Sequence, residues 1–186
     1  MKKSSFARAM KTLAAATGLA TAILWACYCR FGYGWILSAA ISTGTTFYHF
    51  AMRLLVGWIV PRFFREGSLY RSRWFRPLSF EPALHRALKV KKWKDHMPTY
   101  DPSSFCLKDN SLEQIVCAGC VAEAVHEVIV PLSFVPVFFS SFFGALPVFV
   151  ITSVLAALFD SCFILMQRYN RPRLVRILSK MEAKSL

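Results

Sequence analysis

The sequence has few of the residues on which metal centres in membrane enzymes depend. Its 186 residues include only four histidines, and the motif Glu123-x-x-His126 has no second copy. A di-iron helical bundle needs two such motifs and further carboxylates, and membrane oxygenases of the desaturase kind need many more histidines. We therefore expect no metal, and a metal-dependent lipid oxidase is only a distant alternative.

The six cysteines are scattered along the chain, and no small, loop-rich scaffold surrounds them. Cys117 and Cys120 form a CxxC motif, but a zinc site would need a second pair of ligands, and a thioredoxin-like site would follow a strand. We expect most of the cysteines to be small buried apolar residues rather than a disulfide framework or a metal centre.

Acidic residues are also scarce, with 10 Asp and Glu against 23 Lys and Arg, which gives a formal net charge of +13. A nucleic-acid-binding protein would carry its basic residues on a folded, water-soluble face, whereas here they lie between apolar runs. Hydrophobic residues make up 55% of the chain. The composition therefore predicts a membrane protein without a nucleic-acid partner.

Four apolar runs dominate the chain and predict an all-α integral membrane protein. Trp25 fits poorly with the small residues that signal-peptide cleavage requires, so the first run is interpreted as an uncleaved anchor. Pro131 and Pro136 make the third run short or broken. The predicted single membrane domain, residues 1–186, has transmembrane helices at 12–29, 35–60, 128–143 and 148–166, a loop at 61–127 and a basic tail at 167–186.

The basic residues fall on alternate connections. Residues 61–127 carry eleven Lys or Arg, the N-terminus carries four and the tail carries six, whereas the two other connections hold only Arg30. The positive-inside rule then places both termini and the large loop in the cytoplasm, on one face of the cell membrane. Arginines alternate with aromatic residues in this loop, and the pattern from Pro82 to Trp93 is amphipathic, so we expect interfacial helices there.

A second helical pattern begins at Ser111, which has the capping-box spacing with Gln114. Three interpretations of the pair Glu123 and His126 stay open: a metal site, a structural hydrogen bond or ion pair with the basic loop, and general base catalysis. In the last of these, the carboxylate fixes the tautomer of an imidazole that takes a proton from a hydroxyl group. The pair lies on the apolar stripe of Leu112, Ile115, Val116 and Gly119.

The segment 167–174, QRYNRPRL, follows the last apolar run. A positive-inside anchor would explain its arginines but not the adjoining amides and tyrosine. The residue before a proline avoids helical angles, so Arg171-Pro172-Arg173 predicts an extended piece whose guanidinium groups bind phosphate or carboxylate. Candidate substrate-binding residues here are Gln167, Arg168, Asn170, Arg171 and Arg173.

Polar residues also interrupt two of the apolar runs. His49 and Arg53 are four residues apart and share one helix face. Either Arg53 snorkels to the surface while His49 makes an interhelical hydrogen bond, or both close a substrate site from the second run. Asp160 lies near the basic end of the fourth run, and we expect it to pair with an arginine.

The segments VKKWKD (90–95), AEAVHE (122–127) and ILMQRYNRPRL (164–174), in this order, resemble the glycosyl-4,4'-diaponeurosporenoate acyltransferase family. That family acylates the sugar of a carotenoid glycoside, and YHFAMR (48–53) is also similar to some members. The resemblance supports the scaffold and the reaction class. For this reaction we expect His126 to be the general base, Glu123 to orient it, and Trp93, Lys94 and Asp95 to line the same substrate mouth. Because Glu127 and a proline-containing run replace an ELIHW-like context after the histidine, the acceptor need not be a carotenoid glycoside.

These observations predict a membrane acyltransferase that moves a fatty acyl group from an activated donor to a hydroxyl group of a glycolipid or carotenoid glycoside. The donor is expected to be acyl-CoA or a similar co-substrate, and no other cofactor is expected. The partners are then the acyl donor, the lipid substrate and the membrane, while the sequence gives no oligomeric state. The alternative is a non-enzymatic membrane protein that binds anionic lipid or a partner through its basic face.

Overall fold

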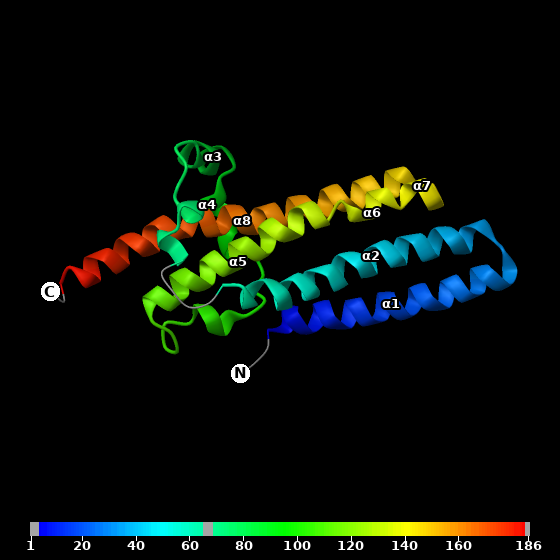
Figure 1. Cartoon of the computed structure of the whole chain (residues 1–186), viewed down its shortest axis with the longest axis horizontal. Helices are drawn as coiled ribbons and strands as arrows, with labels where there is room; N and C mark the ends of the chain where they lie inside the picture. Colours follow the sequence, from blue (N-terminus) through cyan, green and yellow to red (C-terminus); the bar gives the residue numbers. More distant parts are fainter. Residues whose placement is uncertain (1–3, 65–68, 185–186) are drawn as a thin grey trace. The chain divides into compact units, whose positions relative to one another are not determined.

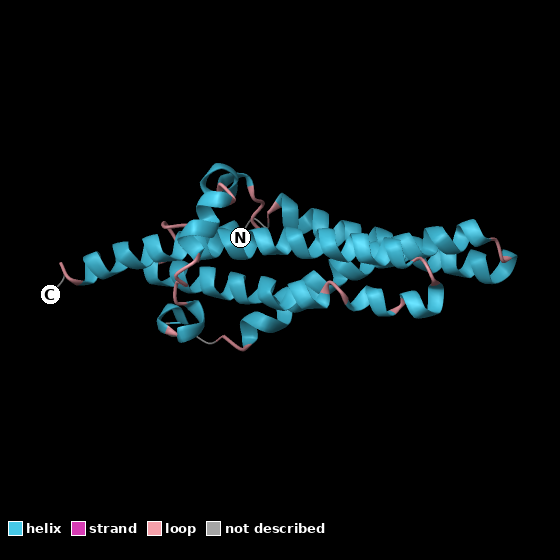
Figure 2. Cartoon of the chain, turned by 90° about the horizontal axis from the view of Figure 1, so that it is seen from above, coloured by secondary structure: helices cyan, strands magenta, loops and turns pink. Residues whose placement is uncertain are grey.

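A computed structural model describes residues 4–64 and 69–184 of the chain. These residues form helices and connecting loops, with no strand among them (Figure 2), so the predicted all-α class is confirmed. The chain divides into two compact units. Unit 1 comprises Met1–Ser4, Ile59–Glu127 and Ser161–Leu186, and unit 2 comprises Ser5–Trp58 and Val128–Asp160.

Unit 2 begins with two long helices, α1 (Ser5–Phe31) and α2 (Gly34–Ile59), which lie side by side and antiparallel (Figure 1). A Cβ atom added at Gly18 would lie 3.0 Å from the ring of Phe47, so a larger residue would have to push this ring aside. The hydroxyl of Thr21 donates a hydrogen bond to the hydroxyl of Thr43 at 3.1 Å. Small residues and interhelical hydrogen bonds are what hold helices together in lipid, where apolar burial gives no driving force.

The rest of unit 2 comes from the end of α5 (Leu112–Leu132), from α6 (Val135–Phe138) and α7 (Ser140–Phe143), and from the start of α8 (Leu146–Glu182). The hydroxyl of Tyr48 donates to the carbonyl of Leu132 at 2.8 Å, which satisfies a carbonyl group where α5 ends. Gly144 and Ala145 have positive φ angles of 66° and 53° and turn the chain into α8.

Three helical segments are long and apolar enough to cross a membrane, namely Ser5–Phe31, Leu112–Phe143 and Leu146–Glu182. The protein is therefore a membrane protein. Helix α2 is not among the three, so four crossings stay a prediction. Its hydroxyl-bearing residues lower the hydropathy, although most of them donate to carbonyls one turn earlier in the same helix, as Thr45 does to Ile41 at 2.8 Å.

Unit 1 contains the basic loop as a series of short helices. The predicted amphipathic helix is divided at Lys89, whose φ of 50° is incompatible with a continuous helix. Residues 65–68 of the aromatic and basic stretch lie outside the described residues. The short helices are η1 (Val60–Arg62), η2 (Leu69–Arg71), η3 (Arg73–Phe75), α3 (Glu81–Ala87), α4 (Val90–Trp93), η4 (Lys94–His96) and η5 (Pro102–Phe105).

Helix α5 starts at the predicted capping box. The N–H of Ser111 donates to the side-chain oxygen of Gln114 at 2.8 Å, and the N–H of Gln114 donates to the hydroxyl of Ser111 at 3.2 Å. The predicted stripe is buried, with Val116 2% exposed. Cys120 is fully buried and forms a small core with Phe75 and Ala124, as expected for a cysteine that acts as a small apolar residue. The expectation that most cysteines are buried is wrong, since Cys29 is exposed and the other four are half-buried.

Helix α8 runs without a break from Leu146 to Glu182, with Pro172 inside it. The prediction of an extended piece at Arg171-Pro172-Arg173 is therefore wrong. An internal proline removes one backbone hydrogen bond and costs a helix about 3 kcal/mol. Here Arg171, the residue that the proline restricts, is buried and ion-paired with Glu123, and this tertiary contact offsets the cost.

Removing the capping box should loosen the start of α5. Ser111→Ala deletes the acceptor for the N–H of Gln114, and we expect a local loss of about 1 kcal/mol. Hydrogen exchange of the amides at 112–115, followed by mass spectrometry in detergent, should become several times faster. Ser141→Ala, which deletes an exposed hydroxyl bonded to the carbonyl of Phe138, is the matched control. Unchanged exchange in Ser111→Ala would contradict the assignment.

Candidate functional site

Two of the sequence motifs, AEAVHE and QRYNRPRL, meet in unit 1, where α5 and α8 lie against each other. The ring of His126 on α5 stacks on the ring of Phe163 on α8, with the centroids 4.4 Å apart and the planes within 4°. Further along, a Cβ atom at Gly119 would lie 3.2 Å from the side-chain oxygen of Gln167. The contacts follow opposite orders along the two helices, so α5 and α8 are antiparallel, and Gly119 allows their close approach.

Arg168 binds three carboxylates at once. Its Nη1 lies 2.6 Å from Oε1 of Glu81, its Nε lies 2.9 Å from Oε1 of Glu123, and its Nη2 lies 3.3 Å from Oε1 of Glu127. The indole N–H of Trp74 donates to the other oxygen of Glu127 at 2.6 Å. The planar guanidinium thus directs its N–H groups to acids from both α3 and α5.

Arg171 completes the network one turn further along α8. Its guanidinium forms an ion pair with Glu123, with a second contact of 3.4 Å from Nη2 to Oε1. The carbon of this guanidinium lies 5.2 Å from the centre of the Phe75 ring. The side chain of Glu123 is fully buried, and that of Arg171 is 5% exposed. We call these residues the ion cluster: Glu81, Glu123, Glu127, Arg168 and Arg171.

The ion cluster bears on two roles expected from the sequence. Arg168 and Arg171 were assigned to an anion of the substrate, and their guanidinium groups are bound by carboxylates of the protein. Glu123, expected to orient His126, is held by both arginines. These contacts give all three residues a structural role, and the roles expected from the sequence stay predictions.

The other residues of QRYNRPRL lie on different sides of α8. Arg173 is exposed, and its guanidinium carbon lies 3.9 Å from the centre of the Tyr169 ring. Asn170 is half-buried. Tyr169 also meets His85 of α3 edge-on, with the ring centroids 5.4 Å apart. The motif therefore supplies two arginines to the ion cluster and presents a third to solvent.

Trp93, Lys94 and Asp95 lie where α4 passes into η4. The indole N–H of Trp93 donates to the carbonyl of Leu88 at 3.0 Å, and the ammonium of Lys94 lies 2.5 Å from Oδ1 of Asp95. The side chain of Asp95 is 73% exposed and that of Lys94 is 19% exposed. The partners in these contacts come from the same short segment, and the substrate roles of the three residues stay predictions.

His49 and Arg53 belong to unit 2. Arg53 forms an ion pair with Asp160 and donates to the carbonyl of Ala156 at 3.3 Å. Asp160 thus pairs with an arginine, but with Arg53 of α2 and not with one from the basic end of the last run, as its position in the sequence suggests. The snorkelling of Arg53 is wrong, since its side chain is only 12% exposed. The hydrogen bond expected from the ring of His49 is also absent from the described residues, because neighbouring Tyr48 makes the interhelical bond instead.

Three residues in or beside the ion cluster are not part of the site expected from the sequence. They are Glu81 and Glu127, which belong to the cluster, and His85, which lies beside it. Glu81 is an isolated carboxylate in a strongly basic stretch, and that isolation was the available signal. His85 follows it by one turn of α3. Burial lowers the pKa of His85 from its ordinary value of 6.5; the carboxylate of Glu81 opposes this shift, and the positive charges of Arg173 and Arg168 add to it.

The described residues form a helical membrane protein, and unit 1 is organised around the ion cluster. The family model of glycosyl-4,4'-diaponeurosporenoate acyltransferase matches residues 71–180, which include the whole ion cluster and His126. This match covers more than half of the chain. The protein belongs to this family of acyltransferases, as the sequence motifs indicate. No curated protein and no solved structure matches the chain.

Breaking the ion cluster should destabilise unit 1. Glu123→Leu leaves the buried charge of Arg171 without a counter-charge, and we expect a loss of about 3 to 5 kcal/mol. The double variant Glu123→Leu with Arg171→Met should recover much of this loss. Thermal unfolding in detergent measures both, and Arg176→Met, which removes an exposed arginine, is the control. A double variant less stable than Glu123→Leu would refute the pairing.

Acid should weaken the packing around His85. Its pKa is lowered in the folded protein, so the unfolded chain binds the proton first as the pH falls. The stability that His85 contributes is therefore present above about pH 6.5 and lost below it. The melting temperature of the wild type should fall more than that of His85→Gln between about pH 7 and about pH 5. Parallel profiles of the two proteins would disprove this.

Proposed function

We propose that this acyltransferase moves a fatty acyl group from acyl-CoA, or a similar thioester, to a hydroxyl group of a membrane glycolipid, of which a carotenoid glycoside is one example. Membership of the family supports acyl transfer, and the membrane-length helices support a lipid acceptor. In this proposal the protein lies in the cell membrane with both termini in the cytoplasm, where acyl-CoA is available. No other cofactor takes part.

The observation that carries the mechanism is the stack of His126 on Phe163. Parallel rings at this distance fix the plane of the imidazole, and a general base needs such a fixed geometry before its pKa matters. His126 takes the proton of the acceptor hydroxyl, and the hydroxyl oxygen attacks the thioester carbonyl. The carbon–sulfur bond then breaks, and the imidazolium returns the proton to the leaving thiolate.

The ion cluster supports this base from one turn away. Glu123 is three residues before His126 on α5, and two arginines of α8 hold its carboxylate. Catalytic groups work best when the residues beneath them are fixed by packing and hydrogen bonds. In our proposal, Arg168 and Arg171 hold α5 against α8, and exposed Arg173 is the arginine of the motif that contacts anionic groups of the substrate.

Replacing the proposed base should abolish acyl transfer. His126→Ala should lower the rate at least a hundredfold, because general base catalysis contributes about 10² to 10⁴. The assay follows labelled palmitoyl-CoA into glycolipid in membranes that contain equal amounts of each variant. His96→Ala removes an exposed histidine from η4 and should retain activity. A His126→Ala protein with activity close to the wild type would rule out the base.

Comparing the lipids of cells with and without the gene identifies the acceptor. The loss of an acylated glycolipid, with accumulation of the unacylated form, is the expected result. The non-enzymatic alternative is favoured by the exposed arginines at positions 71, 73 and 76, which suit anionic headgroups. It predicts unchanged lipid composition, tolerance of His126→Ala, and binding to anionic liposomes that weakens whenever any of the three charges is removed.

A further inference from the structure

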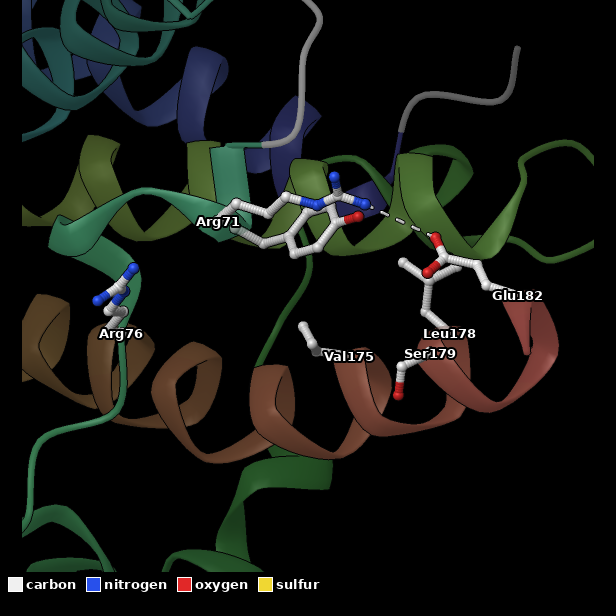
Figure 3. Close-up of a pocket in the computed structure, with 7 residues that line it drawn as sticks. Arg71, Arg76, Val175, Leu178, Ser179 and Glu182 are labelled. Carbon is white, nitrogen blue, oxygen red and sulfur yellow. Dashed lines mark ion pairs between the residues drawn. The ribbon is translucent and has the colours of Figure 1, made fainter.

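A cavity of about 370 Å³ lies between the η2–η3 segment and the last turns of α8, all within unit 1 (Figure 3). Neither the sequence motifs nor the proposed base belongs to it. Its lining combines apolar side chains with two arginines and one carboxylate. The lining residues are Tyr70, Arg71, Arg76, Val175, Leu178, Ser179 and Glu182.

The two arginines of this cavity are available to an anion. Arg76 is exposed, and no hydrogen bond or ion pair engages its guanidinium within the described part of the chain. Arg71 reaches across the cavity to Glu182, with 3.8 Å between Nη2 and Oε1, and the two side chains are 64% and 52% exposed. An exposed pair at this distance is weak, so an anion with more charge can displace the carboxylate.

The α8 side of the cavity adds two apolar side chains to Ser179 and Glu182. Val175 and Leu178 come from α8, and the ring of Tyr70 lies beneath Arg71, whose guanidinium carbon is 5.5 Å from the ring centre. Guanidinium groups suit phosphate because they form paired hydrogen bonds with it. Arg71 and Arg76 lie in one cavity with the apolar side chains of Val175 and Leu178. This combination fits a phosphate that carries an uncharged chain better than a free inorganic ion.

The cavity continues the face of α8 that carries the proposed site. Phe163, Gln167 and Arg171 face α5, and Val175, Leu178 and Glu182 extend the same spacing of three and four residues. The cavity and the stack of His126 on Phe163 therefore lie on the same side of α8. The twelve residues from Phe163 to Val175 correspond to about 18 Å along the axis, and the cavity extends further.

We propose that this cavity binds the phosphate of the phosphopantetheine arm of the acyl donor. An extended arm of this kind has a length similar to the separation of the cavity from His126, so a phosphate at Arg71 and Arg76 places the thioester near the imidazole. Because α5 and the ion cluster cover the face of α8 between the cavity and His126, the pantetheine chain passes along the outside of this packed interface. Glu182 is displaced from Arg71 when the phosphate enters. This inference rests on the proposed acyl transfer, for which it supplies the donor-binding residues.

Substrate truncation tests the site. S-palmitoyl pantetheine differs from S-palmitoyl 4'-phosphopantetheine only by the phosphate, and the wild type should use it with a KM at least tenfold above that for the phosphorylated donor, as expected for loss of charged hydrogen bonds. Arg76→Ala and Arg71→Ala should raise the KM for palmitoyl-CoA by a similar factor and leave the KM for the truncated donor and kcat unchanged. Arg73→Ala removes the same charge from the same segment outside the cavity, and should change neither KM.

Two further variants sharpen the test. Glu182→Gln removes the competing carboxylate and should lower the KM for palmitoyl-CoA. Arg76→Lys keeps the charge but not the paired hydrogen bonds, and should recover only part of the lost affinity. Equal effects of Arg73→Ala and Arg76→Ala, or a wild type that does not distinguish the two donors, would overturn the proposal.

Direct binding separates this inference from the proposed function. Coenzyme A titrated into His126→Ala protein in detergent, followed by calorimetry, should bind as tightly as to the wild type, and Arg76→Ala should weaken binding about tenfold. Binding without any acyl transfer would reject the proposed function and keep the site. Acyl transfer that does not depend on Arg76 would reject the phosphate site and leave the proposed function in place. A protein that does not bind coenzyme A, but binds phosphatidylglycerol liposomes through Arg76, would also reject the phosphate site.

Discussion

Unit 1 depends on enclosing two guanidinium groups, that of buried Arg171 and that of half-buried Arg168, among three carboxylates. Taking an ion out of water costs several kcal/mol even after relaxation, and attraction repays this only when the geometry satisfies most hydrogen-bonding groups. Arg168 meets the condition by reaching Glu81, Glu123 and Glu127 in three directions, and Arg171 meets it with Glu123 and the face of Phe75. Helices α3, α5 and α8 are therefore fixed relative to one another by charge as well as by packing.

This network changes the interpretation of QRYNRPRL. Arg168 and Arg171 are three residues apart and so point to the same side of α8, toward the acids. An extended backbone at Pro172 would alternate the directions of its side chains, and the two arginines could not both reach Glu123. The continuous helix is thus a requirement of the ion cluster, and the proline is tolerated because the cluster holds the turn before it.

Local patterns predicted much of the fold, whereas the partners of the charges needed the tertiary structure. The capping box at Ser111 and the buried stripe before Glu123 follow from helical spacing and are present as expected. No spacing rule connects Glu81 to Arg168, because 87 residues separate them and the connection includes several short helices. The sequence indicates that Arg53 and Asp160 each need a partner, because a charge inside an apolar run is costly. That they pair with each other is seen only in the structure.

The ion cluster also constrains the proposed chemistry. Since two arginines already compensate the charge of Glu123, this carboxylate gives little extra stabilisation to an imidazolium at His126. The proton taken from the acceptor must then be passed on quickly. A thioester donor suits this condition, because the thiolate leaves as a stable anion and can take the proton after the carbon–sulfur bond breaks. In the proposed mechanism a thiol therefore leaves more readily than an alcohol, whose alkoxide would need its proton before the bond breaks.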